Sequence, residues 1–160
     1  MKPFTAALLT ALLSTQALAA TDPAPVTPLL GAWSVDISRL PMAPQARPKS
    51  VTITFSSAGA GKLAAKVEVI DPTGARLEAE GVTPLDGTAT PVKSNFEADM
   101  SATTMPIPEV LIMQLAKGGT PASTRIYTVA ADGKTMTETV AFFGADGQPL
   151  FRKNYFSRSR

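Results

Sequence analysis

Residues 124–157 read TRIYTVAADGKTMTETVAFFGADGQPLFRKNYFS, and this stretch indicates three consecutive β-strands. Apolar and polar residues alternate with a period of two over 124–130, 135–143 and 150–157, which places one face of each strand in a core. Asp132-Gly133 and Asp146-Gly147 separate the three segments. Asp-Gly is a strong hairpin signal because it accommodates the positive φ angles of tight turns. The stretch therefore predicts an antiparallel meander.

The same alternation extends toward the N-terminus. Further strands are expected at 31–37, 51–55, 63–69, 76–80 and 110–116. Prolines punctuate the region between Gly81 and Pro108, where they limit the donation of ladder hydrogen bonds. A strand near 98–104 is therefore expected to be short or to lie at a sheet edge. No segment beyond the first twenty residues has a sustained helical period, so no helix longer than one or two turns is expected.

Eight to ten antiparallel strands joined by short hairpins predict an all-β fold. We expect an up-and-down meander closed as a barrel, because closure removes the exposed strand edges. A two-sheet β-sandwich is the alternative, and strand spacing alone does not separate the two. The chain of 160 residues has the length of one domain. We expect that domain to span 29–160, preceded by a disordered lead at 21–28.

The first twenty residues predict an export signal. Lys2 supplies a positive start, a leucine-containing apolar run follows, and Ala17-Leu18-Ala19 has the small-x-small pattern of a cleavage site. A membrane anchor is the weaker alternative, because a spanning helix needs about 20 apolar residues and this run is shorter and interrupted. We expect a cleaved signal peptide at 1–20 and a periplasmic or secreted protein without a stable membrane anchor.

The composition argues against several classes of function. The chain has no Cys and no His, which removes disulfides, thiolate nucleophiles, Cys/His zinc sites and His-based catalysis. Fifteen basic against thirteen acidic residues give a net charge of +2, too small a surplus for tracking nucleic-acid phosphates. Single Asp-Gly pairs do not supply the several oxygens of a calcium loop. We expect no enzyme activity, no metal, no cofactor and no nucleic-acid partner.

Gly31-Ala32-Trp33 opens the first expected strand with a Gly-x-Trp pattern that resembles lipocalins. The turn and strand-edge stretches at 48–52, 86–92, 131–137 and 144–149 resemble small exported bacterial lipocalin-like proteins, most of which have no known function. The likeness runs from about Leu29 to the C-terminus. The Thr-Asp-Tyr motif of typical lipocalins is missing, so the resemblance implies the wider barrel fold and no specific ligand.

The resemblance also implies structural roles at one end of the barrel. In lipocalins the Trp of this motif packs across the closed end, and an Arg from the region of the last strand lies over it. Gly31 and Trp33 match the motif here. Arg152 and Arg158 are the candidates for the Arg, and Arg158 is preferred because it follows the last expected strand.

Apolar side chains on the inner face suggest a ligand site, because a small barrel is either filled by side chains or holds one small ligand. The candidates for contact with a ligand are Phe55, Met113, Met136 and Phe142, with Glu138, Tyr127 or Tyr155 fixing its polar end. We expect the protein to bind a small apolar or amphipathic molecule in the barrel interior. The alternative is a filled barrel that acts as an envelope interaction or stress protein, with Pro84–Pro108 as the surface for an unidentified partner.

Overall fold

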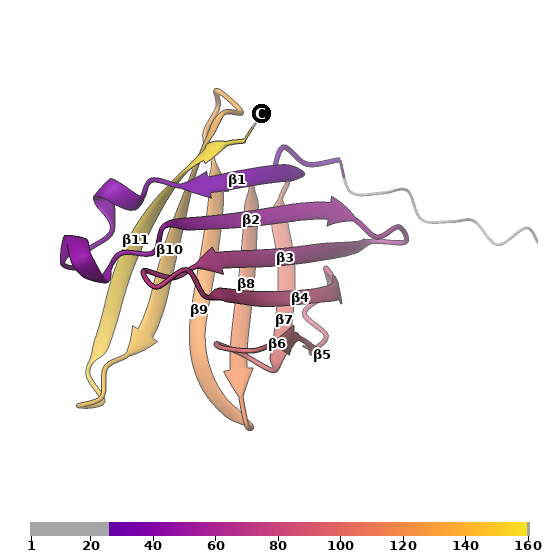
Figure 1. Cartoon of the computed structure of the whole chain (residues 1–160). Helices are drawn as coiled ribbons and strands as arrows, with labels where there is room; N and C mark the ends of the chain where they lie inside the picture. The colour runs from indigo at the N-terminus through magenta and orange to yellow at the C-terminus, as the bar shows by residue number, and fades with distance from the viewer. Residues whose placement is uncertain (1–25, 160) are drawn as a thin grey trace, which may run out of the picture.

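The computed structural model describes residues 26–159, which form one antiparallel sheet of eleven strands rolled into a nearly closed barrel (Figure 1). Within this range there is no α-helix, and the two helical segments are three-residue 3-10 turns, η1 (Ile37–Arg39) and η2 (Pro44–Ala46). None of its helices is long and apolar enough to cross a membrane. The predicted all-β meander is confirmed, and the barrel is preferred over the sandwich because every strand belongs to a single sheet.

The strands follow each other along the chain with few interruptions. The first six are β1 (Gly31–Val35), β2 (Ser50–Ser57), β3 (Lys62–Ile70), β4 (Arg76–Pro84), β5 (Thr90–Pro91) and β6 (Lys93–Ser94). The last five are β7 (Met100–Ile107), β8 (Val110–Lys117), β9 (Thr120–Val129), β10 (Thr135–Phe143) and β11 (Pro149–Arg158).

Sheet closure depends on two contacts. The two ends of the chain meet where β1 pairs with β11, with Trp33 opposite Arg158. Between β4 and β7 the gap is bridged by the two shortest strands, since β6 pairs with β4 and β5 pairs with β7. These two strands are joined through Val92. The barrel therefore closes through a short, irregular stretch of chain at this point, which lies in the proline-punctuated region.

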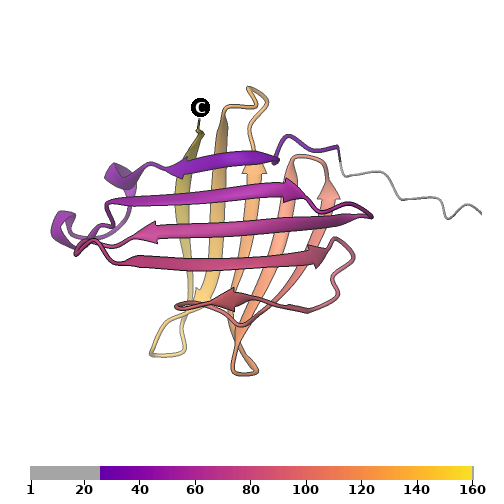
Figure 2. The same cartoon turned by 45° about the vertical axis from the view of Figure 1, so that its right-hand side comes forward.

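The core fills the space between two crossing layers of the rolled sheet. Figure 2 shows β1–β4 running across the front of the molecule and β7–β11 running steeply behind them. Side chains on the inner face of both layers form one buried apolar cluster, made by Leu29, Trp33, Ile53, Phe55, Leu63, Leu111, Met113, Tyr127, Val129, Met136 and Phe156. The period of two expected from the sequence is visible on β10, where Met136, Glu138 and Val140 are buried.

Two predicted elements differ from the structure. The first strand ends at Val35 and does not reach residue 37, because the Asp36 carboxylate accepts a 3.1 Å hydrogen bond from the Ser38 backbone N–H and starts η1. The strand expected near 98–104 runs for eight residues as β7, and on the side away from β8 it pairs with the two residues of β5 and, through an isolated bridge at Thr104, with Asp86. The predicted signal peptide at 1–20 lies outside the described residues, as does most of the lead at 21–28.

One end of the barrel is closed by Trp33 and Arg158. Trp33 is fully buried, and its indole N–H donates a 2.8 Å hydrogen bond to the Leu29 carbonyl. The Arg158 guanidinium carbon lies 4.2 Å from the centre of the indole ring. All three of its donor nitrogens bind backbone carbonyls, those of Gly133 at 2.8 Å, Leu30 at 2.7 Å and Pro28 at 2.5 Å. The preference for Arg158 over Arg152 at this position is confirmed.

Gly31 completes this end of the barrel. Its φ angle of +119° is one that other residues rarely adopt, and a Cβ at this position would lie 2.7 Å from Arg158 Nη1. The guanidinium cannot move away without losing hydrogen bonds to the backbone. Glycine is therefore required here both by the backbone conformation and by the close approach of the arginine.

Candidate functional site

The interior of the barrel holds a small cavity between β2–β4 in front and β7–β9 behind. Its volume is about 50 Å³, which is room for on the order of four water molecules. The apolar part of its wall includes Ile53, Phe55, Val67, Met113 and Leu115. The polar part includes Thr83, Glu97, Ser101, Arg125 and Tyr127. The cavity is therefore amphipathic, because aromatic and aliphatic groups share its wall with ionisable ones.

A charged cluster includes two of the polar residues of this cavity wall, Arg125 and Glu97. The Arg125 guanidinium donates one hydrogen bond of 2.7 Å to Glu138 Oε1 and another to Glu97 Oε1. The second carboxylate oxygen of Glu138 accepts a 2.6 Å hydrogen bond from the Asn154 side-chain amide. The side chains of Arg125 and Glu138 are only 11% and 2% exposed, whereas that of Glu97 is 35% exposed. One carboxylate is therefore interior and the other reaches toward solvent.

Strand register brings these groups together. Glu138 on β10 lies between Tyr127 on β9 and Asn154 on β11. Arg125 is two residues from Tyr127, so both side chains point to the inner face. Glu97 comes from the irregular segment between β6 and β7. Three neighbouring strands thus position the buried part of the cluster, and the irregular segment supplies its outer carboxylate.

The environment of the cluster shifts two pKa values. Burial raises the pKa of the Tyr127 phenol well above its ordinary value, and the nearby Glu138 carboxylate adds to this effect. For Arg125, burial by itself lowers the pKa of the guanidinium. The acidic groups around it, those of Tyr127, Glu138 and Glu97, outweigh burial and raise that pKa. At neutral pH the site consequently presents a neutral phenol beside a permanent cation.

Some polar atoms near the cluster have no hydrogen-bond partner among the described residues. They include Arg125 Nε, Asn154 Oδ1 and Thr103 Oγ1. A buried polar group without a partner costs about 1–3 kcal/mol, and a half-satisfied network is less favourable than an apolar core. The inner face around Arg125 therefore retains donor and acceptor capacity for a further polar group.

Several of the ligand-contacting residues expected from the sequence do meet in the interior. Phe55, Met113 and Tyr127 line the cavity, and the rings of Phe55 and Tyr127 pack edge to face with centroids 5.4 Å apart. Met136 is buried in the core away from the cavity wall. Glu138 is buried behind Arg125 and binds it, so its predicted inward orientation is confirmed.

Two of the expected residues lie elsewhere. Tyr155 is on the opposite face of β11 from buried Asn154 and Phe156, and the Arg39 guanidinium carbon lies 3.3 Å from its ring centre. The expectation that Tyr155 lines the interior is therefore wrong. Phe142 lines a second hollow of about 390 Å³ where β9 and β10 separate, beyond the last paired residues, and this hollow adjoins the cavity at Ser101 and Leu115. It does not contribute to the cavity wall.

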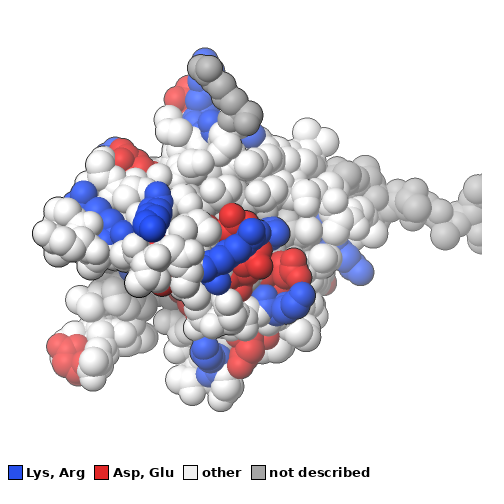
Figure 3. Space-filling model, viewed as in Figure 1, with Lys and Arg blue, Asp and Glu red and all other residues white. Residues whose placement is uncertain are grey.

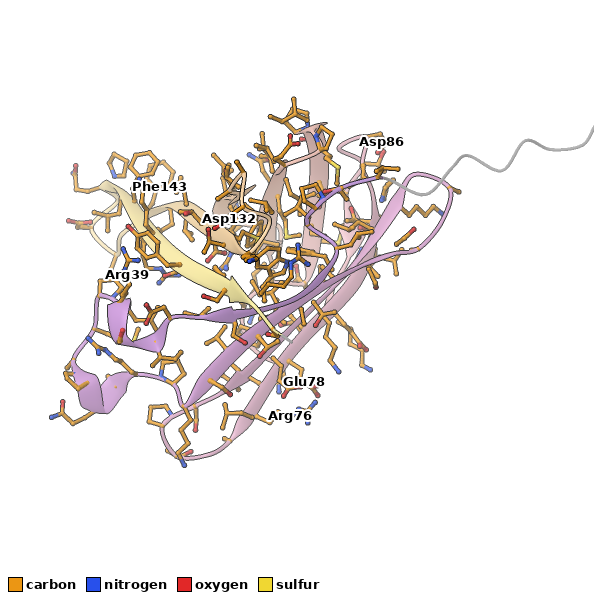
Figure 4. The ribbon with its side chains drawn as sticks, turned by 90° about the horizontal axis from the view of Figure 1, so that it is seen from above. Arg39, Arg76, Glu78, Asp86, Asp132 and Phe143 are labelled. Atoms are coloured by element: carbon orange, nitrogen blue, oxygen red, sulfur yellow. The ribbon has the colours of Figure 1, made fainter. Side chains whose placement is uncertain are left out.

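This second hollow is lined by apolar and uncharged residues, all of which belong to β7–β11 except Ala89. Two of them, Phe143 and Phe151, are 72% and 77% exposed. Figure 4 shows Phe143 at the far end of the β10–β11 hairpin, well away from the interior.

The outer face of β3 and β4 carries charged side chains, because Arg76 binds Glu68 at 2.5 Å and Glu78 at 2.8 Å there. Figure 3 shows these mixed charges on the front of the molecule.

The sequence reasoning missed Arg125, Glu97 and Asn154. Arg125 had a detectable signal, because it has the same inward parity on its strand as Tyr127. Asn154 likewise shares the parity of Phe156 on β11. Glu97 had no such signal, since it lies in a segment without periodicity.

Comparisons of the chain with protein-family models, curated proteins and solved structures found no match.

Proposed function

We propose that this protein binds a small amphipathic molecule inside its barrel. The apolar part of the ligand packs against Phe55 and Met113, and its polar end lies at Arg125 and Tyr127. One observation carries the proposal, namely a cavity whose wall combines apolar side chains with a partly unsatisfied charged cluster. Binding sites for small molecules have this combination of an apolar lining and a few convergent polar groups.

The charged cluster supports binding better than it supports stability. Replacing a buried ion pair with apolar residues of similar volume is often neutral or stabilising by about 1–4 kcal/mol. A barrel that needs only a filled core therefore gains nothing from Arg125 and Glu138 at its centre. A ligand that accepts a hydrogen bond from the free Arg125 Nε–H would explain why these charged residues lie in the interior.

The size of the cavity limits the ligand. Small-molecule pockets usually measure about 300–1,000 Å³, and 50 Å³ is far below that range. The ligand must therefore be a short-chain molecule, and part of its volume must come from movement of the wall. Octanol is a suitable probe, because it has a short apolar chain and one polar end. With nine non-hydrogen atoms we expect a Kd on the order of 100 µM.

Isothermal titration calorimetry with octanol tests the proposal, with two alanine-to-phenylalanine variants to locate the site. Ala79 lines the interior cavity, and Ala102 lines the hollow near Phe142. We expect Ala79→Phe to abolish octanol binding and Ala102→Phe to leave it unchanged. Loss of binding only in Ala102→Phe would place the site in the hollow near Phe142. No binding by the wild type would refute the proposal.

The second candidate function is protein interaction by a barrel without a ligand. The exposed Phe143, Leu150 and Phe151 on the β10–β11 hairpin favour it, since large exposed apolar side chains grouped together often mark interaction sites. These residues line the same hollow as Ala89, Met100 and Ala102, which belong to the Pro84–Pro108 region expected from the sequence. A wild type that binds no octanol, combined with self-association or partner binding that is lost in Phe151→Ser, would favour this function.

A further inference from the structure

The two carboxylates that bind Arg125 are held very differently. Glu138 is on a central strand, is fully buried and is fixed by Asn154. Glu97 lies in the segment 95–99, between the end of β6 and the start of β7, where no ladder pairing occurs among the described residues. Its carboxylate reaches Arg125 from the side that is open to solvent. Glu97 is therefore the partner that can leave the guanidinium without exposing the core.

Glu97 also forms part of the cavity wall. Its neighbour Ala98 lines the same cavity, so the segment 95–99 covers the interior at the place where the barrel closes through β5 and β6. Backbone hydrogen bonds anchor the segment at both ends, from Asn95 N–H to the Glu78 carbonyl and from Asp99 N–H to the Ala116 carbonyl. Withdrawal of the Glu97 side chain would add its volume to the cavity.

The charges determine which ligand can replace Glu97. Arg125 with Glu97 and Glu138 carries one net negative charge, and a third carboxylate cannot be added to this buried group without further cost. A carboxylate that takes the place of Glu97 keeps the charge constant, while Glu97 becomes hydrated. A guanidinium binds a carboxylate through two parallel hydrogen bonds, and Arg125 has its Nε–H free for this geometry.

We propose that the ligand is a short-chain carboxylate that binds by displacing Glu97 from Arg125. This inference rests on the proposed function, and it adds the chemical class of the ligand and the residue that controls entry. Glu97 acts as an internal competitor, which occupies the guanidinium when no ligand is bound. The hydrocarbon chain of the ligand packs against the apolar part of the cavity wall, at Phe55 and Met113.

Titration of the full-length protein with octanoate and octanol tests the inference. In Glu97→Gln the internal competitor is neutral, so octanoate should bind at least tenfold more tightly than to the wild type, while octanol changes by less than twofold. Glu109→Gln is the matched control, because it removes the same charge from an exposed turn. It should change neither affinity. Arg125→Lys keeps a cation for Glu138 but loses the fork, so it should weaken octanoate at least tenfold and octanol by a smaller factor.

The possible outcomes separate the two proposals. If octanol binds but Glu97→Gln does not change the affinity for octanoate, the displacement of Glu97 is refuted. The proposed binding function then still holds. An equal gain for octanol and octanoate in Glu97→Gln would mean that Glu97 only blocks entry, and it would refute the carboxylate site. Failure of both ligands to bind any variant would refute the proposed function and, with it, the inference.

Discussion

Removal of the Arg158 side chain should destabilise the barrel far more than an ordinary surface substitution. Arg158→Ala loses three hydrogen bonds from a charged donor to backbone carbonyls and a cation–π contact with Trp33 at 4.2 Å. Hydrogen bonds to charged groups contribute about 1.5–3 kcal/mol each, and water replaces part of this at the accessible carbonyls. The cation–π contact adds about 0.5–2 kcal/mol.

We therefore expect Arg158→Ala to lower the free energy of unfolding by about 3–5 kcal/mol, against about 0.5 kcal/mol for a typical surface change. Urea denaturation followed by circular dichroism measures this, and Trp33 fluorescence provides a second probe. Trp33→Ala should cost a similar amount, about 3–5 kcal/mol, as expected for a large buried aromatic. A loss below 1 kcal/mol in Arg158→Ala would refute the argument that this arginine holds the barrel end together.

A double-mutant cycle with Gly31 tests the geometry of the same contact. A Cβ at position 31 would lie 2.7 Å from Arg158 Nη1 and would also strain the backbone at φ +119°. Gly31→Ala should therefore destabilise the wild type more than it destabilises Arg158→Ala, because only the backbone strain remains when the guanidinium is absent. Equal effects in both backgrounds would show that the close approach to Arg158 carries no energy.

Three further predictions concern the interior and the N-terminus. Glu138→Leu leaves the buried guanidinium with only one carboxylate, so it should lower the free energy of unfolding by about 3–5 kcal/mol in urea denaturation. Burial raises the pKa of Tyr127, so the unfolded chain loses that phenol proton first. The contribution of Tyr127 to stability should stay constant below about pH 10 and fall above it by up to about 1.4 kcal/mol per pH unit, and Tyr127→Phe should remove this contribution. The sequence predicts export with cleavage, so N-terminal sequencing of the protein made in its host should begin at residue 20 or 21, and an intact residue 1 would contradict this prediction.

The hairpins and the barrel end could be predicted because their signals are local. Asp132-Gly133 has few conformational alternatives, and the alternation of β10 continues unbroken from Met136 to Val140. Gly31, Trp33 and Arg158 followed from the resemblance to lipocalins, and the observed packing agrees with the roles it implied.

The interior site was predicted only in part, for physical reasons that differ between residues. Tyr155 was misplaced because β11 alternates poorly, with Asn154 inside and aromatic side chains on both faces. Arg125 was overlooked because a charged residue on a strand is normally outward, and its inward position depends on Glu138 and Glu97. Glu97 lies in an aperiodic segment, so only the way the barrel closes in three dimensions brings it to the cavity.

The most direct test of ligand binding in the interior is a methyl spectrum of the methionine-labelled protein. Met113 lines the interior cavity, and Met100 lines the hollow near Phe142. Met42 is exposed on the loop between β1 and β2. Addition of octanol should shift the Met113 methyl signal in a saturable manner and leave those of Met100 and Met42 in place. A shift of Met100 with an unchanged Met113, or no saturable shift of either, would contradict binding inside the barrel.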